Sequence, residues 1–389
     1  MKKGSWLPVL ILTVAAFVFN TSEFVPIGLL SDIAGDLGIS ESKAGFLISA
    51  YAWVVAIVSL PLMMAFSHTE YRKLMIGVVG LFTISHALSA TATGYTALMI
   101  SRMGVACSHA IFWAVTTPLA VKVAPEGRGP LAMSFIMTGT SLAQIMGMPL
   151  GRMIGLALGW RLTFLSVGAV AALVLILLFT MFPKVANDTQ FAISDLPAIL
   201  RNRRLLVIYL IIILLVTGHF TGYSYIEPFL LQVAGLPQTT ITIVLMLFGI
   251  AGVVSSVIFS KGYPAHCKFL SGLAAVGITE SLMIMRITSS SLWMIIAMCM
   301  FWGICMTMMN LVFQAELMRT EKNATTVAMA LYSGLFNLGI GAGALIGGRI
   351  VSGPGVEQVG GYGAAIALMG AVAVFFYLYK SVQVKLGKS

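Results

Sequence analysis

The chain has 389 residues, of which 59% are hydrophobic and only 9% are charged. A soluble domain needs roughly a quarter of its residues charged to cover its surface, so this composition excludes a soluble protein and indicates a surface that faces lipid. The formal net charge of +10 therefore matters through its placement along the chain, and we expect no nucleic-acid partner.

Twelve apolar segments follow one another along the chain, each near the ~20 residues that a helix needs to cross a bilayer. Within lipid every backbone group must be bonded internally, so we expect helices. The first segment is too long for a typical signal peptide and is expected to stay uncleaved. The expected spans are 7–30, 43–66, 74–93, 97–122, 130–157, 162–182, 205–229, 239–260, 269–288, 291–316, 324–351 and 358–380.

Most of the 23 Lys and Arg residues fall on the side of the expected membrane that holds the N-terminus. The positive-inside rule then places both termini in the cytoplasm. The loops between the spans are short, which leaves no room for a soluble catalytic or nucleotide-binding domain.

A polar stretch divides the chain into two similar halves. We expect an N-terminal six-helix bundle over 1–182, a cytoplasmic linker over 183–204 and a C-terminal six-helix bundle over 205–389. Glu23 and Pro26 near the end of the first span are echoed by Glu227-Pro228 near the end of the seventh. The prediction is an all-α integral membrane protein with two parallel repeats around a central cavity.

Several charges lie inside expected spans, among them Glu23 in the first and Arg102 in the fourth. A charge at the bilayer centre costs about 2.5–3.5 kcal/mol on insertion scales, so each needs a partner or a wet cavity. The two fall at similar depth and could form an ion pair. Such a pair can load and release a proton as its surroundings change, or it can be a fixed bridge between helices; we favour the proton-coupling role.

His109 and Trp113 extend the helical face that begins at Arg102. An imidazole and an indole beside a charge form a platform on which a sugar ring can stack, although His109 could equally be a hydrogen-bonded core residue. His86 is expected to be a hydrogen-bonding residue of the core.

A second set of polar groups lies in the C-terminal half. His219, Tyr223 and Glu227 follow one another at i, i+4 and i+8 and would form one stripe on a helix. Single polar residues often simply join helices, but their presence on several spans favours a lined cavity. The remaining predicted substrate-binding residues are Asn20, Asn310 and Asn337.

Glycine patterns indicate close helix packing and not nucleotide binding. Gly147, Gly151 and Gly155 form a double GxxxG motif, and Gly343 with Gly347 forms another, inside apolar spans. The P-loop pattern GxxxxGK[ST] is absent from the sequence, so ATP-driven transport by this chain alone is not expected. The four cysteines show no CxxC spacing, and we expect neither a metal nor a cofactor.

The sequence resembles the bacterial sugar efflux transporters, the arabinose and isopropyl-thiogalactoside exporters, within the drug:proton antiporter branch of the major facilitator superfamily. The segments that carry the likeness are Phe19-Asn-Thr-Ser-Glu23-Phe-Val-Pro26, Tyr51-Ala-Trp53, Ser101-Arg102, His109-Ala-Ile-Phe-Trp113, Gly147-Met-Pro149-Leu-Gly151-Arg152, Gly159-Trp160-Arg161, Tyr223-Ser-Tyr225-Ile-Glu227-Pro228 and Phe336-Asn337.

The resemblance implies roles for three groups of residues. Arg102 resembles the arginine that the family links to proton coupling. Gly147, Pro149, Gly151 and Gly155 resemble the antiporter motif, which implies exchange. Of the family's cytoplasmic gate motif only Arg72 and Lys73 remain here, so the usual charge relay at that gate is in doubt.

We therefore predict proton-coupled efflux of small sugars or sugar analogues, such as arabinose and thiogalactosides, by a monomer in the lipid bilayer. The alternative is a multidrug or chloramphenicol-type proton-antiport exporter. An enzyme is not expected, because His86, His109 and His219 lie on three spans without metalloprotease-like spacing.

Overall fold

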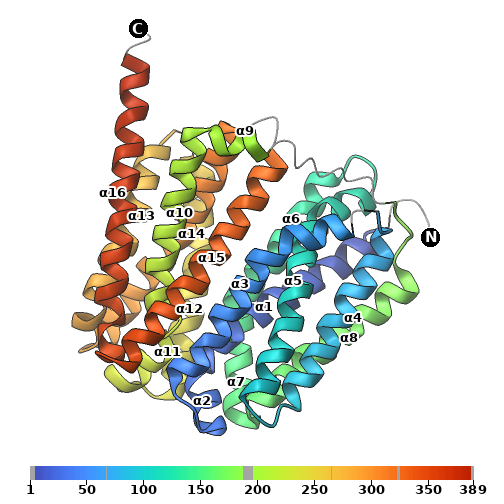
Figure 1. The fold of residues 1–389 in the computed structure, drawn as a ribbon, viewed down its shortest axis with the longest axis horizontal. Helices are drawn as coiled ribbons and strands as arrows, with labels where there is room; N and C mark the ends of the chain where they lie inside the picture. Colours follow the sequence, from blue (N-terminus) through green and yellow to red (C-terminus); the bar gives the residue numbers. More distant parts are fainter. Residues whose placement is uncertain (1–4, 67, 187–195, 264, 322–324, 387–389) are drawn as a thin grey trace. The chain divides into compact units, whose positions relative to one another are not determined.

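The computed structural model describes residues 5–66, 68–186, 196–263, 265–321 and 325–386, and all regular structure in these residues is helical (Figure 1). The α-helices are α1 (Leu7–Gly28), α2 (Leu30–Leu37), α3 (Glu41–Ala65), α4 (Tyr71–Ala90), α5 (Tyr95–Val123), α6 (Gly129–Leu142), α7 (Met148–Leu158), α8 (Trp160–Met181), α9 (Leu196–Arg201), α10 (Arg203–Tyr223), α11 (Ile226–Pro228), α12 (Gln238–Gly262), α13 (Cys267–Thr288), α14 (Leu292–Thr320), α15 (Thr325–Ser352) and α16 (Val359–Leu386). Two short π-helical segments, η1 (Ala143–Gly147) and η3 (Phe229–Val233), and one 3₁₀ turn, η4 (Val356–Gln358), complete the described elements.

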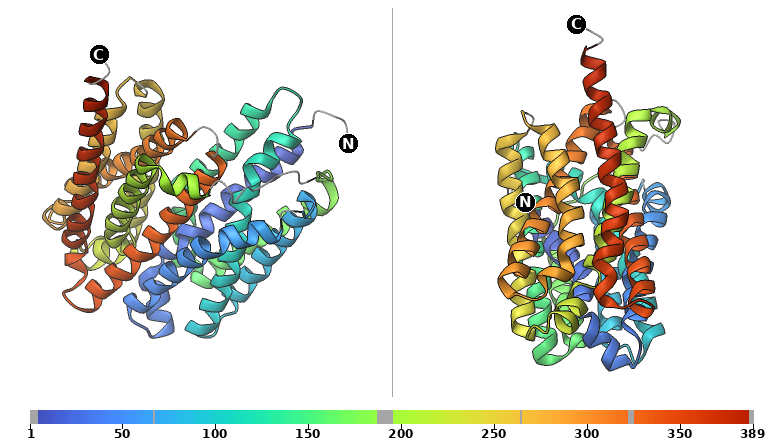
Figure 2. Two further views of the ribbon diagram at one scale, coloured as in Figure 1. Left: turned by 45° about the horizontal axis from the view of Figure 1, so that its top comes forward. Right: turned by 90° about the vertical axis from the view of Figure 1, so that its left-hand side faces the viewer.

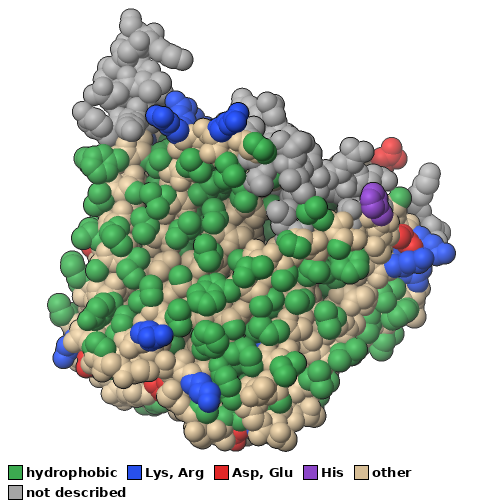
Figure 3. Space-filling view, viewed as in Figure 1, with side chains coloured by type: hydrophobic (Ala, Val, Ile, Leu, Met, Phe, Trp, Pro, Cys, Tyr) green, Lys and Arg blue, Asp and Glu red, His purple; other side chains and the backbone are tan. Residues whose placement is uncertain are grey.

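Among the described residues, twelve helical stretches are long and apolar enough to cross a membrane. Large apolar side chains point outward along them, such as Ile57 (71% exposed) and Trp293 (78% exposed), and Figure 3 shows such side chains spread over the helices. The chain is a multi-pass membrane protein, as the sequence predicts. The stretches are Leu7–Gly28, Glu41–Ser59, Tyr71–Ala90, Tyr95–Val123, Leu131–Leu158, Trp160–Met181, Arg203–Tyr223, Gln238–Gly262, Cys267–Thr288, Leu292–Thr320, Val327–Ser352 and Val356–Tyr377.

Two of the expected spans are interrupted near their ends. The expected helix over 7–30 stops at Gly28, and α2 starts again at Leu30 after one residue with non-helical backbone angles. The expected helix over 205–229 stops at Tyr223, and a short turn precedes α11. Apolar residues recur beyond both breaks, Leu29-Leu30 after the first and Phe229-Leu230 after the second, so the length of an apolar segment does not reveal them.

Contacts divide the chain into two compact units. The first comprises Met1–Ile39 and Ala50–Phe191, and the second comprises Ser40–Ser49 and Ala192–Ser389. The start of α3 thus belongs to the second unit and its remainder to the first.

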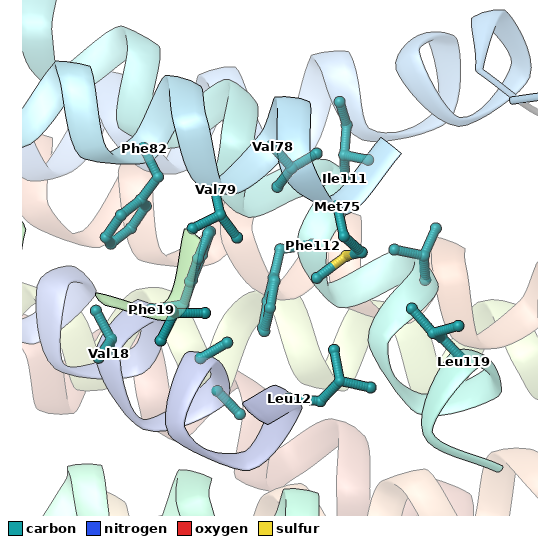
Figure 4. Packing of buried hydrophobic residues seen from close by; sticks show 14 of the residues in the cluster. Leu12, Val18, Phe19, Met75, Val78, Val79, Phe82, Ile111, Phe112 and Leu119 are labelled. Atoms are coloured by element: carbon teal, nitrogen blue, oxygen red, sulfur yellow. The ribbon is translucent and has the colours of Figure 1, made fainter. Parts of the chain in front are cut away.

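The core of the first unit joins α1, α4 and α5. Phe19 of α1 stacks on Phe82 of α4 and on Phe112 of α5, with ring centroids 3.9 and 4.0 Å apart. Figure 4 shows these rings within a layer of aliphatic side chains that includes Leu12 and Val79. This packing holds the middle of α1 against α4 and α5, where many of the buried polar groups of this unit lie.

A polar contact ties α2 to α8 in the same unit. Asp36 accepts hydrogen bonds from Arg161 Nη1 (2.5 Å) and Trp160 Nε1 (3.1 Å). Arg161 also donates to the Ala92 carbonyl, just after α4 ends. The Arg161 hydrogen bond is the main reason that the pKa of Asp36 lies below its usual value.

In the second unit α10 packs against both α15 and α16, which run beside it in Figures 1 and 2. Glycines bring these helices together. A Cβ added to Gly343 of α15 would lie 2.5 Å from the Thr217 carbonyl oxygen of α10. A Cβ on Gly218 of α10 would lie 2.7 Å from the Gly363 carbonyl oxygen of α16. Small residues at these points allow the close backbone approach expected of membrane helices.

Candidate functional site

The site in the first unit is built around a carbonyl group that a proline frees. Pro26 lies inside α1 and has no N–H, so the Ser22 carbonyl, four residues earlier, cannot receive the usual helical hydrogen bond. Arg102 of α5 donates Nη2 to this carbonyl (3.1 Å) and Nη1 to the Ser22 hydroxyl oxygen (3.2 Å). Both ends of the guanidinium are therefore held by one residue of α1.

Aromatic rings surround the same guanidinium. Arg102 is only 2% exposed, and its Cζ lies 4.7 Å from the centroid of the Tyr51 ring and 5.6 Å from that of Phe164. Ring faces stabilise a desolvated cation. The Tyr51 hydroxyl is buried and has no hydrogen-bond partner within the described residues.

Glu23 lies beside His109. Glu23 Oε2 and His109 Nε2 are 3.7 Å apart, and the Glu23 side chain is 14% exposed. Within the described residues Glu23 forms no ion pair with Arg102, whose guanidinium is engaged by Ser22. The two residues predicted to couple protons thus lie on adjacent helices with different direct partners.

His109 is the centre of an aromatic group in the first unit. Its ring lies edge-on to Tyr51 at 5.6 Å and to Trp113 at 6.0 Å. Its Nδ1 is buried without a hydrogen-bond partner in the part of the chain that the structure describes. His109 and Trp113 therefore lie together as the sequence predicts, and Tyr51 joins them.

Asn20, also predicted to bind substrate, instead links two helices. Its Nδ2 donates to the Thr140 carbonyl of α6 at 3.2 Å, and the residue is 5% exposed. This is the joining role that single polar residues often have in membrane helices.

The second unit contains an aromatic cluster on α10, α12 and α14. His219 stacks on Tyr223 (4.9 Å) and meets Trp302 edge-on (5.1 Å), and Phe248 lies 4.8 Å from Tyr223. The ring nitrogens His219 Nδ1 and Trp302 Nε1 are buried without partners among the described residues. Trp302 was not among the residues predicted from the sequence, although it lies about two helical turns before Asn310 on α14.

The predicted stripe of His219, Tyr223 and Glu227 is not continuous. Because α10 ends at Tyr223 and the chain turns at Ser224 and Tyr225, Glu227 lies on the separate short helix α11. Glu227 is completely buried. The i, i+4, i+8 spacing assumed an unbroken helix, and this part of the prediction is wrong.

Asn310 and Asn337 have different surroundings. The Asn310 Oδ1 accepts hydrogen bonds from Gln314 Nε2 (2.8 Å) and from the Tyr332 hydroxyl (2.9 Å), and so joins α14 to α15. Asn337 donates only to Ser333 one turn earlier, and its Oδ1 has no partner within the described residues. Asn337 therefore retains a free acceptor.

The glycines of the predicted antiporter motif face α1. A Cβ on Gly151 would lie 2.6 Å from Val25 Cγ2, and one on Gly155 would lie 2.5 Å from Leu29 Cδ2. Gly147, the last residue of η1, faces Thr21 in the same way. Pro149 follows in the first turn of α7. The motif thus brings the backbone of this span close to α1, and its π-helical segment is a feature often found at functional sites.

Arg72 and Lys73, predicted at a cytoplasmic gate, lie in the first turn of α4. Arg72 Nε donates to the Leu178 carbonyl at 3.2 Å, and its Nη2 donates to the Phe179 carbonyl. Arg72 therefore satisfies the carbonyls at the C-terminus of α8, where a cation is favourable. Lys73 is exposed.

Comparisons with known proteins agree with this architecture. The sequence profile of the Major Facilitator Superfamily matches residues 12–325. Crystal structures of a bacterial homologue of the human lysosomal transporter Spinster are similar in fold. The inward-facing unoccupied structure has a TM-score of 0.73 at 15% identity over 95% of each chain. The inward-facing occupied structure has a TM-score of 0.75 at 16% identity over 96% of each chain. Because the family profile covers most of the sequence, the chain belongs to the major facilitator superfamily of membrane transporters.

Proposed function

We propose that this transporter exports small sugars or sugar analogues across the bacterial inner membrane in exchange for protons. The observation that carries the proposal is the arrangement of Glu23, a carboxyl group within a membrane span whose Oε2 lies 3.7 Å from the ring nitrogen Nε2 of His109. The nearby guanidinium of Arg102 is held by Ser22 instead.

A carboxylate in this position suits proton exchange. Burial favours the neutral acid, whereas a nearby cation favours the carboxylate, so modest changes in hydration or charge separation move the balance between them. A permanent ion pair with Arg102 would hold Glu23 in its charged form. The absence of that contact supports a proton-carrying role.

The unpartnered polar atoms favour a neutral cargo with hydroxyl groups. In the first unit His109 lies edge-on to both Trp113 and Tyr51, and its Nδ1 and the Tyr51 hydroxyl have no partner among the described residues. In the second unit His219 Nδ1 and Trp302 Nε1 lie within the aromatic cluster. Hydrogen-bonding groups among aromatic rings suit a pyranose or furanose, whose hydroxyls and C–H faces need both kinds of contact.

The composition of α14 favours the second candidate, a multidrug exporter. This helix contains seven methionines, including Met306 and Met308. Methionine side chains adapt their shape and are common at promiscuous binding surfaces. A chloramphenicol-type drug would use such a surface better than a sugar would.

The test uses purified protein in proteoliposomes with an imposed pH gradient. We expect uptake of labelled arabinose or thiogalactoside into liposomes with an acidic lumen, and no uptake without the gradient. Glu23→Gln should abolish gradient-driven transport while leaving exchange of internal for external sugar at equal pH. Glu280→Gln is the matched control, because Glu280 lies in the α13 span but is exposed on its surface.

Two results would overturn the proposal. Unchanged pH-driven transport by the Glu23→Gln variant would remove Glu23 from the coupling mechanism. Uptake of chloramphenicol without uptake of either sugar would establish the multidrug alternative.

A further inference from the structure

A chain of hydrogen bonds connects α4, α1 and α5 behind the proposed proton site. His86 Nδ1 is 3.0 Å from the Phe82 carbonyl, and His86 Nε2 is 2.8 Å from the Ser22 hydroxyl oxygen. The same hydroxyl oxygen is 3.2 Å from Arg102 Nη1. His86 and Ser22 are both completely buried.

The direction of every bond in this chain follows from its two ends. The Phe82 carbonyl can only accept, so His86 must carry its proton on Nδ1. In neutral histidine Nε2 is then an acceptor, and it receives the Ser22 hydroxyl proton. The guanidinium of Arg102 can only donate, and it donates to the lone pairs that remain on the Ser22 oxygen.

The structure around His86 favours its neutral form. A protonated His86 would donate from Nε2 to Ser22, so the hydroxyl would face two cationic donors and its own proton would need another acceptor. The ring is enclosed by Phe82 (4.2 Å) and Phe164 (6.1 Å). Gly168 of α8 allows this enclosure, because a Cβ there would lie 2.9 Å from the Cβ of His86.

We propose that His86 and Ser22 are positioning residues that hold Arg102 on α1 and thereby keep it from forming a permanent ion pair with Glu23. Pro26 frees the Ser22 carbonyl for Arg102 Nη2, and His86 orients the Ser22 hydroxyl for Arg102 Nη1. The inference rests on the proposed proton-coupled function. His86 and Ser22 would then decide whether Arg102 pairs with Ser22 or with Glu23, although neither residue binds the proton or the cargo.

Among the described residues, the titratable groups next to this network are Glu23 on α1, Tyr51 on α3, His86 on α4, and Arg102 and His109 on α5. On α8 the ring beside Arg102 is the uncharged Phe164. If the Ser22 contacts were lost, the Arg102 guanidinium would be free to pair with the Glu23 carboxylate. An adjacent cation favours the charged carboxylate, so proton-driven transport would then require a more acidic compartment.

The first test is spectroscopic and does not depend on transport. In full-length protein labelled with ¹⁵N-histidine in liposomes, solid-state NMR distinguishes the two neutral tautomers and the imidazolium. We expect His86, identified by the signal that disappears in His86→Gln, to be protonated on Nδ1 only, from pH 6 to pH 8. An Nε2-protonated or doubly protonated His86 would overturn the proposal.

The second test compares two substitutions of His86. A Gln side chain can place an acceptor where Nε2 lies and so retain the Ser22 contact, whereas the shorter Asn reaches only the position of Nδ1. We expect His86→Asn and Ser22→Ala to lower gradient-driven sugar transport at neutral pH by about tenfold and to shift its pH profile toward acid by about one unit. His86→Gln should restore both toward the wild type.

The control is Ser89→Ala, which removes a completely buried hydroxyl of α4 that is hydrogen-bonded to the Ser101 hydroxyl of α5. It should leave the pH profile unchanged. A wild-type pH profile in both His86→Asn and Ser22→Ala, with folded protein by size-exclusion chromatography, would refute the positioning role. Failure of the wild-type protein itself to respond to a pH gradient would instead refute the proposed function.

Discussion

Replacement of Gly343 by alanine tests whether close backbone contact between α10 and α15 stabilises the second unit. The new Cβ would lie 2.5 Å from the Thr217 carbonyl oxygen, 2.8 Å from Phe220 Cβ and 2.9 Å from the Thr221 nitrogen. Ordinary contact begins at 3.4 Å, so the closest pair falls short by about 0.9 Å. Two of the three atoms belong to the backbone of α10 and cannot turn away as a flexible side chain would.

The expected free-energy change combines two opposing effects. Overpacking in a tightly packed region costs roughly 1–3 kcal/mol, and alanine in place of glycine within a helix contributes about 0.5–1 kcal/mol in the other direction. The net expectation is a destabilisation of about 1–2 kcal/mol. For a unit of this size that corresponds to a fall of about 2–8 °C in Tm.

The assay is the loss of the monodisperse peak in fluorescence-detected size-exclusion chromatography after heating in detergent. Gly272→Ala is the matched control, because Gly272 lies within α13 of the same unit and a Cβ there would meet nothing within 4 Å. That variant should match or exceed the wild-type Tm. If Gly343→Ala were as stable as Gly272→Ala, close approach of α10 and α15 would not be the reason for the glycine.

Three further changes test contacts described above. Asp36→Asn should lower Tm slightly at neutral pH, by the ~0.2–1 kcal/mol of an exposed ion pair, since Asp36 and Arg161 are 45% and 37% exposed. The pKa of Asp36 is lowered in the folded protein, so this stabilisation is present above the unfolded-state pKa and is lost as pH falls through the folded-state pKa. A Tm difference between wild type and variant that persisted well below pH 3.8 would contradict this pH dependence. Tyr332→Phe should cost about 1 kcal/mol, since it removes the buried hydrogen bond to Asn310, and an unchanged Tm would show that this bond contributes nothing. Arg72→Ala should cost about 0.3–1 kcal/mol through loss of the cation at the end of α8, with the effect reduced in high salt; salt-independent destabilisation would indicate lost packing instead.

The transmembrane spans could be predicted well because the signal is local. An apolar run of about twenty residues satisfies its own backbone as a helix whatever its neighbours are, and all twelve expected segments correspond to described helices. The interruptions after Gly28 and Tyr223 were not predicted in this way, because apolar residues recur beyond each point and the expected spans were extended to include them. The assumed stripe through Glu227 failed for this reason.

The sequence predicted the residues of the candidate site but not the contacts that each of them makes. Glu23 and Arg102 were identifiable because a charge in lipid is costly and therefore informative. Neither the contact of Glu23 with His109 nor Ser22 as the acceptor for Arg102 follows from spacing along the chain. The sequence does imply that the Ser22 carbonyl lacks its helical hydrogen bond, because Pro26 lies four residues later. It does not reveal which side chain donates a hydrogen bond to that carbonyl instead.

Sequence by itself determined the class of molecule, because composition and the length of apolar runs decide how a chain meets the bilayer. It also determined which residues need a compensating group, because a charge within the membrane is costly without one. Only the tertiary structure decided how each need is met. Arg102 of α5 donates to Ser22 of α1, whose hydroxyl is oriented by His86 of α4. Hydrogen bonds of about 3 Å between helices depend on how α1, α4 and α5 pack around Phe19, and not on the order of residues within any one helix.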